Sequence, residues 1–125
     1  MGGNGSFKRG ETLSAENRKY ETVFMIDENT AILEQKDKRK GIKLPEESHT
    51  PGRIYAAFRK DGKDVKLIAV YNENGLKLYE IHTDDHRGLN PHYHPWKNGK
   101  PEEDKVYPLE MDMIKLLKKI RNFGK

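Results

Sequence analysis

The chain contains no cysteine, a single tryptophan and no long run of apolar residues. Without thiols it has no disulfide framework, no cysteine-based zinc site and no thiol nucleophile, so any bound metal must be held by histidine and carboxylate groups. No stretch approaches the roughly 20 apolar residues that span a bilayer, and the residues from Met1 to Arg9 lack the apolar segment of a secretory signal. These absences predict a cytoplasmic protein without a membrane span.

The length and composition predict one small domain with a thin hydrophobic core. The chain has 125 residues, of which 34% are hydrophobic and 35% are charged, and a usual domain comprises about 100 to 150 residues. Residues 1–12 are rich in glycine, with Phe7 as their apolar anchor, so little burial offsets the entropy of ordering them. We therefore expect a flexible arm over residues 1–12 and a single domain over residues 13–125.

Positive charge is concentrated in the second part of the chain. The net charge of +4 comes from residues 51–125, which hold fifteen lysines and arginines against eleven aspartates and glutamates. Such an excess favours a polyanionic partner, whether nucleic acid, a phosphorylated ligand or an acidic host or phage protein. It is equally compatible with a solubilising role, because interspersed Lys and Glu keep a small domain in solution.

Six short apolar runs predict a β-sheet. The dipeptides Asp61-Gly62 and Asn74-Gly75 separate three of them and favour tight turns, because these residue types tolerate positive φ. The first two runs predict a hairpin, and the stretch from Lys36 to Gly52 predicts a loop or crossover. Pro95 confines the last run to an edge or to a strand end. The six runs are Tyr20–Ile26, Ala31–Gln35, Arg53–Lys60, Val65–Tyr71, Leu76–Thr83 and His92–Trp96.

The C-terminal segment changes to a helical period. Apolar residues recur at helical spacing from Leu109 to Phe123, which predicts an amphipathic helix over Pro108–Phe123. Its apolar stripe most simply covers an apolar face of the sheet, because a coiled-coil seam would need a longer stripe. The predicted fold class is therefore α+β: an antiparallel meander sheet of four to six strands with one C-terminal amphipathic helix packed on it.

Four of the five histidines fall within one segment, between residues 82 and 94. By strand parity His82 shares a face with Glu80, and His92 and His94 share a face with Trp96. If the intervening loop folds the later run back beside the earlier one, His82, His92 and His94 converge. Imidazole is a common metal ligand and is also suited to proton transfer near neutral pH, so both chemistries are open to this cluster.

One interpretation of the cluster is a divalent metal site. Two or three of the histidines would bind Zn, Mn or Ni, and a nearby carboxylate would complete the ligand set. The histidine spacing matches no named zinc motif. The candidate ligands are His82, His86, His92, His94, Asp84 and Asp85.

A second interpretation is metal-free acid–base catalysis on a phosphodiester. The candidate catalytic residues are His82, His92 and His94, one acting as general base and another as general acid. Arg87 or Lys97 would stabilise the charge that develops on the phosphate. In RNA, the substrate's own 2′-hydroxyl can serve as the nucleophile.

A third interpretation is a cationic and aromatic surface that binds a base or a protein partner without catalysis. The plainest alternative is that these histidines are ordinary polar residues on the exposed face of an edge strand. The candidate substrate-binding residues are Arg87, Tyr93, Trp96, Lys97 and, in the loop that precedes the meander, His49.

Several segments of the chain resemble a family of phage and prophage proteins. They are Gly3–Phe7, Lys43–Pro51, Arg53–Tyr55 and the pair His92 and His94. The similar proteins are small, or form C-terminal extensions of minor head proteins, and are encoded beside head-morphogenesis genes of Gram-positive bacterial phages. The resemblance implies a phage origin and a likeness to toxin-type tips, which often are nucleases. No catalytic residue is established for that family.

The leading hypothesis is a phage-encoded domain that acts on nucleic acid or another phosphate ester through the histidine cluster, in the host bacterial cytoplasm or associated with the virion. The competing hypothesis is a non-enzymatic binding module, such as a virion accessory protein or an inhibitor of a host defence protein. Geometry separates the two, because catalysis needs side chains that converge in a concave pocket, whereas a binding patch can leave them splayed on a flat surface.

Overall fold

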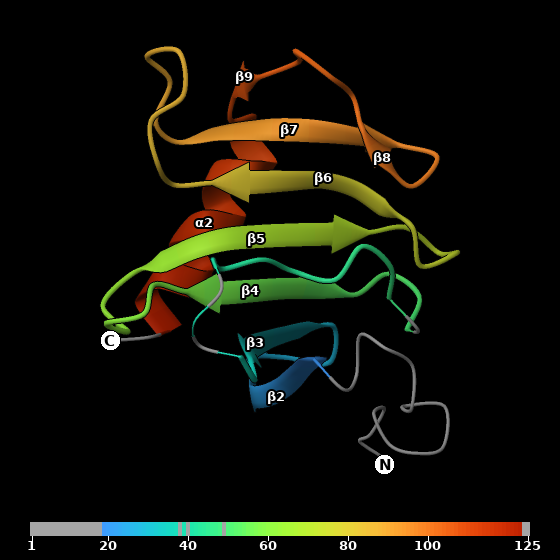
Figure 1. Cartoon of the computed structure of the whole chain (residues 1–125), viewed down its shortest axis with the longest axis vertical. Helices are drawn as coiled ribbons and strands as arrows, with labels where there is room; N and C mark the ends of the chain where they lie inside the picture. Colours follow the sequence, from blue (N-terminus) through green and yellow to red (C-terminus); the bar gives the residue numbers. More distant parts are fainter. Residues whose placement is uncertain (1–18, 38, 40, 49, 124–125) are drawn as a thin grey trace.

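The computed structural model describes residues 19–37, 39, 41–48 and 50–123. The predicted flexible arm over residues 1–12 therefore lies outside the described residues, as does His49. Within the described chain, a single sheet is followed by a C-terminal helix (Figure 1). The elements are β2 (Tyr20–Met25), β3 (Thr30–Gln35), β4 (Ile54–Phe58), β5 (Val65–Tyr71), β6 (Lys77–His82), β7 (His92–Lys97), β8 (Lys100–Pro101), β9 (Tyr107–Pro108) and α2 (Met111–Phe123).

The strands follow one another across the sheet in the order of the sequence, from β2 to β8, and β9 pairs with β7. Every pairing is antiparallel except that between β3 and β4, which is parallel. The α+β fold class with a C-terminal helix is thus confirmed. The parallel pair follows from the long connection between β3 and β4, since a crossover returns the chain in its original direction.

The predicted tight turns lie at the ends of the central strands. Gly62 and Gly75 have φ values of 74° and 81°, the left-handed region that a side chain disfavours. Pro95 lies between the short pairings of β7 with β9 and with β8, and it faces Tyr79 of β6 on the other side. Pro95 thus has no register partner in β8 or β9, and its missing N–H falls in the gap between these two ladders. Its carbonyl oxygen still accepts a hydrogen bond from the Glu102 N–H at 2.9 Å.

Helix α2 covers one face of the sheet. Met113, Leu117 and Ile120 are buried against residues of β4, β5 and β6, including Ile68 and Ile81, and the helix runs behind these strands in Figure 1. The helix begins three residues later than its apolar period suggests, because Tyr107 and Pro108 form β9 instead. No helix of the described residues combines the length and apolar character that crossing a membrane requires.

The opposite face of the sheet is covered by the segment that joins β3 to β4. Leu44 is buried there, and Ile42 packs beside it. The hydroxyl of Tyr71 donates to the carbonyl of Pro45, and the Ser48 N–H donates to the Gly75 carbonyl at 2.8 Å. Leu44 belongs to one buried cluster with apolar residues of β3, β4 and β5. These residues are Ala31, Leu33, Tyr55, Ala57, Leu67, Ala69 and Tyr71.

Leu117→Ala tests the packing of α2. Leu117 is 4% exposed, so the substitution removes buried methyl groups and leaves a cavity, and we expect a loss of about 2 to 5 kcal/mol in the free energy of unfolding. Urea denaturation measures this loss. Lys118→Ala, at the next and exposed position, is the control and should change stability by less than about 0.5 kcal/mol. A comparable effect of both substitutions would contradict the packing.

Gly75→Ala tests the anchoring of the β3–β4 segment. A Cβ atom on Gly75 would stand 2.1 Å from the Ser48 carbonyl oxygen, whereas a Cβ atom on Gly62 would meet nothing within 4 Å. Both residues have positive φ, so Gly62→Ala should cost only the backbone term of about 1 to 2 kcal/mol. Gly75→Ala should cost clearly more in the same thermal or urea denaturation. Equal losses would show that Ser48 does not approach Gly75.

Candidate functional site

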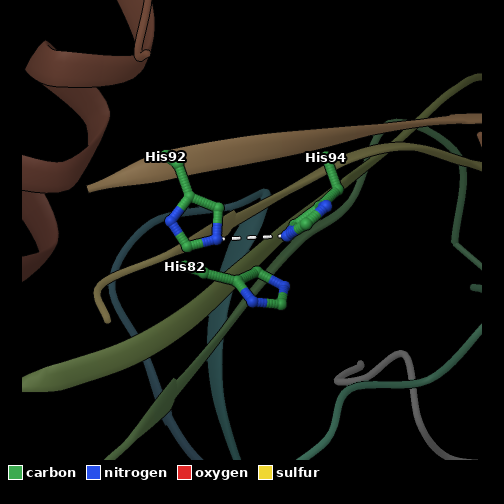
Figure 2. Close-up of side chains that lie close together, drawn as sticks. All are labelled: His82, His92 and His94. Atoms are coloured by element: carbon green, nitrogen blue, oxygen red, sulfur yellow. Dashed lines mark hydrogen bonds between the residues drawn. The ribbon is translucent and has the colours of Figure 1, made fainter. Parts of the chain in front are cut away.

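The pairing of β6 with β7 brings three histidines together. His82 lies directly opposite His92, and Glu80 lies directly opposite His94. These residues share the face of the sheet that points away from α2, since His82 is also the cross-strand partner of Leu67 in the opposite core. Figure 2 shows the three imidazoles turned toward one another, and the convergence foreseen from strand parity is thus present.

The imidazoles of the cluster are close enough to share a ligand. One ring nitrogen from each of His82, His92 and His94 lies within 4.8 Å of the other two. The Nε2 atoms of His92 and His94 are 3.1 Å apart. The ring centroids of His82 and His94 are separated by 4.6 Å, and those of His82 and His92 by 5.3 Å. The three side chains therefore form one compact group.

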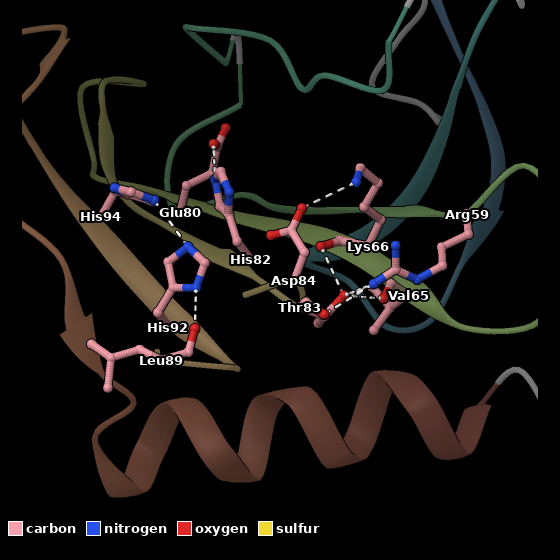
Figure 3. Close-up of polar contacts among 10 residues, drawn as sticks. All are labelled: Arg59, Val65, Lys66, Glu80, His82, Thr83, Asp84, Leu89, His92 and His94. Atoms are coloured by element: carbon pink, nitrogen blue, oxygen red, sulfur yellow. Dashed lines mark hydrogen bonds and ion pairs between the residues drawn. The ribbon is translucent and has the colours of Figure 1, made fainter. Parts of the chain in front are cut away.

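Two of the three rings are oriented by a further hydrogen bond. Nδ1 of His92 donates to the carbonyl oxygen of Leu89 at 3.1 Å, so the lone pair of the neutral ring is on Nε2. Nε2 of His82 donates to Oε1 of Glu80 at 2.8 Å, which leaves Nδ1 as the nitrogen with a lone pair. Figure 3 shows both contacts on the side of the sheet opposite the helix. The tautomers of these two histidines are thus set by their neighbours.

Glu80 is itself held by a buried lysine. Nζ of Lys77 donates to Oε2 of Glu80 at 2.6 Å, and the side chains are 1% and 12% exposed. The ammonium group of Lys77 also lies 4.1 Å from the ring centre of Trp96. Strand alternation predicts Glu80 on the face of His82 and Trp96 on the face of His94, but no sequence pattern indicates a role for Glu80 or Lys77. For Glu80, the alternation of side chains along β6 was the sequence feature that placed it beside His82.

The environment favours a charged carboxylate and neutral imidazoles. Burial raises the pKa of Glu80, but the hydrogen bond from His82 and the charge of Lys77 outweigh it and lower the pKa below its usual value. Burial, together with the neighbouring His82 and His92, lowers the pKa of His94 to about 4. Burial and His82 also lower the pKa of His92. At neutral pH His92 and His94 are therefore available as bases or as ligands.

The other predicted ligands lie around the cluster at different distances. The ring of His86 lies beside the trio, with its centroid 5.5 Å from that of His92 and 5.4 Å from that of His94. Asp84 pairs with Lys66 at 3.3 Å; burial would raise its pKa, but this pairing lowers it. Asp85 is exposed, and among the described residues its side chain forms no hydrogen bond or ion pair with a histidine.

The predicted substrate-binding residues do not form one surface. Tyr93 points to the other face of β7, where it packs against the core under α2 and its hydroxyl donates to Glu110. Arg87 pairs with Asp104 at 3.3 Å. Lys97 is an exposed residue at the end of β7. Of these residues, Trp96 is the one that lies over the Lys77–Glu80 pair next to the cluster.

A separate cavity of about 570 Å³ lies elsewhere on the molecule. It is lined by residues of β3 and β4, by Ile42 and by Phe123 at the end of α2, and it includes no histidine. Arg59, at its border, donates two hydrogen bonds to Thr83. The cavity therefore belongs to a different part of the surface from the histidine cluster.

Comparison of the chain with protein-family models, with curated proteins and with solved structures gives no significant match. The chemistry of the site therefore has to be argued from its geometry. Converging neutral imidazoles with fixed tautomers can exchange protons with a substrate or bind a metal ion, and Trp96 offers an aromatic ring next to them.

The low pKa of His94 predicts a pH-dependent stability. In the unfolded chain His94 titrates at 6.5 but in the folded protein at about 4. Between these values the unfolded state binds a proton that the folded state does not, so the free energy of unfolding should fall as the pH is lowered from about 6.5 towards 4. His94→Gln should flatten this dependence in urea denaturation of chelator-treated protein. NMR titration of the imidazole C–H signals measures the pKa directly, and a His94 midpoint near 6.5 would contradict the prediction.

Proposed function

We propose that the protein is a phage-encoded domain that cleaves nucleic acid or another phosphate ester at the His82, His92 and His94 cluster. The observation that carries the proposal is the convergence of the three imidazoles, which a splayed binding patch would not require. The basic excess of residues 51–125 supports a polyanionic substrate, because positive charge raises the rate of encounter with phosphates. The host cytoplasm or the virion is the proposed location.

The cluster suits the cleavage of a phosphate ester in which protons move at two positions. One neutral imidazole takes a proton from the attacking water, or from the 2′-hydroxyl when the substrate is RNA. The nucleophile's oxygen forms a new bond to phosphorus as the bond from phosphorus to the leaving oxygen breaks. The imidazolium formed in this way, or the imidazole hydrogen-bonded to it, then gives a proton to that leaving oxygen, so charge and atoms balance. His92 and His94 are neutral at physiological pH, which suits the role of base.

Trp96 is the residue best placed to contribute binding without chemistry. It lies on the face of β7 that carries His92 and His94, and its ring contacts the ammonium group of Lys77. Aromatic rings stack on nucleobases with little regard for sequence. In the proposed function, Trp96 therefore binds a nucleobase next to the phosphate that is cleaved.

Cleavage assays with the full chain test the proposed activity. Single-stranded RNA, single-stranded DNA and a chromogenic phosphodiester are incubated with the wild type and with His94→Ala. We expect at least a roughly 100-fold loss of rate in the variant, because loss of a general acid or base commonly costs that much. Lys115→Ala, an exposed position on α2, is the control and should keep the wild-type rate. Identical products from wild type and His94→Ala would refute catalysis at the cluster.

A non-enzymatic binding module is the second candidate, and strand β2 favours it. Among the described strands, β2 ends the sheet order, and it exposes Val23, Phe24 and Met25 at 44%, 50% and 42%. An exposed strand with apolar side chains can pair with a strand of another protein. A virion accessory protein or an inhibitor of a host defence protein would use such a contact. If this second function is correct, the protein cleaves no phosphate ester, and Phe24→Ser weakens its binding to the partner protein.

A further inference from the structure

The spacing of two histidine nitrogens matches that of ligands to one metal ion. Zinc binds imidazole nitrogen at about 2.0 to 2.1 Å in tetrahedral geometry, which puts two ligand nitrogens roughly 3.3 Å apart. The Nε2 atoms of His92 and His94 are 3.1 Å apart. Without a metal, Nε2–H of His94 donates to Nε2 of His92, because Nδ1 of His92 carries that ring's proton. A metal ion would replace this hydrogen bond with two coordinate bonds.

The orienting hydrogen bonds of the cluster are those that metal-binding histidines use. A ligating histidine commonly donates its other ring N–H to a backbone carbonyl or a carboxylate, which fixes the ring and makes the ligating nitrogen more basic. The Leu89 carbonyl has this position at His92, and the Glu80 carboxylate has it at His82. Lys77 in turn holds the second oxygen of Glu80. The cluster thus has the outer contacts of a metal site as well as the nitrogens.

The donor set narrows the choice of metal. Three imidazole nitrogens suit zinc, copper, nickel or iron, whereas calcium and magnesium prefer oxygen ligands. Three protein ligands leave the fourth tetrahedral position of zinc open, as in catalytic rather than structural sites. His94 and His82 are partly exposed, so water or a phosphate oxygen can reach that position.

We propose that His82, His92 and His94 bind one zinc ion, with Glu80 and the Leu89 carbonyl as orienting groups and an open fourth position. His82 would coordinate through Nδ1 and keep its bond to Glu80, and His92 and His94 would coordinate through Nε2. The catalytic meaning of this metal centre rests on the proposed function. With the three imidazoles holding the metal, zinc would supply an activated water for phosphate-ester hydrolysis in place of the imidazole base. Metal binding itself can be measured without any substrate.

Calorimetric titration of tag-free, chelator-treated protein with zinc chloride alone tests the metal centre. We expect one zinc ion per chain, and a rise in melting temperature with zinc. His82→Ala and His94→Ala should each weaken binding by at least roughly 100-fold. His86→Ala is the matched control, because its ring lies beside the cluster but outside the group of three, and it should bind zinc within a few-fold of wild type. Loss of binding in His86→Ala would overturn the three-histidine ligand set.

One further variant, a double substitution, separates orientation from coordination. His92 is 1% exposed, so its replacement could prevent folding. The ligand test therefore uses the partly exposed His82 and His94, and circular dichroism checks that each variant is folded. Lys77→Met combined with Glu80→Gln removes both buried charges together. It should weaken zinc binding by roughly 10- to 100-fold at an unchanged ratio of one ion per chain. An unchanged affinity would remove Glu80 from the site.

Cobalt(II) provides a spectroscopic measurement of geometry. In the proposed site it should give visible absorption bands of tetrahedral intensity that His94→Ala abolishes. If the wild type binds neither ion, or if His82→Ala and His94→Ala bind zinc as tightly as wild type, the metal centre is refuted. Zinc bound by a protein that cleaves no ester refutes the proposed function alone. Cleavage that persists in chelator, by a protein that binds no zinc, refutes the metal centre alone.

Discussion

The register between β6 and β7 is the constraint on which the histidine cluster depends. Because side chains alternate along a strand, a slip of one residue would send His92 and His94 to the face covered by α2. The same register places Ile81 and Tyr93 on that helix-covered face, where both pack against the core. The burial of apolar side chains under α2 thus stabilises the alignment that brings the histidines together on the other side.

A buried charge pair links the cluster to the core on its own face. Removing Lys77 and Glu80 from water is costly, and the cost is offset only when each charge has a close partner. Glu80 receives hydrogen bonds from both Lys77 and His82, and Lys77 also lies over the ring of Trp96. A carboxylate held in this way keeps its charge and orientation. A protein that needed only a stable sheet would be served as well by apolar residues here, so this arrangement supports a functional use of the site.

The two faces of the sheet are closed by different means. Helix α2 supplies an amphipathic surface to one face, and an irregular segment around Leu44 covers the other, where hydrogen bonds to Tyr71 and Gly75 hold it in place. In Figure 1 the described part of that segment runs lengthwise beside β4 and β5, away from β6 and β7. The part of this face formed by β6 and β7 carries polar and histidine side chains in place of an apolar cover.

The sequence by itself determined the strands, the tight turns and the helix, because hydrophobic periodicity and turn residues are local properties of the chain. It also placed His82 with Glu80 and His92 with His94 on common faces, since alternation needs no tertiary information. The parallel pairing of β3 with β4, the later start of α2 and the separation of Tyr93 from the cluster were decided by tertiary structure. So were the contacts of Lys77 with Glu80 and of Leu89 with His92. Each joins residues only three apart in sequence, but simple alternation would put Lys77 and Glu80 on opposite faces of β6, and the register shift between β5 and β6 brings them to the same one. Local pattern sets which face a side chain occupies, and only long-range packing sets what it meets there.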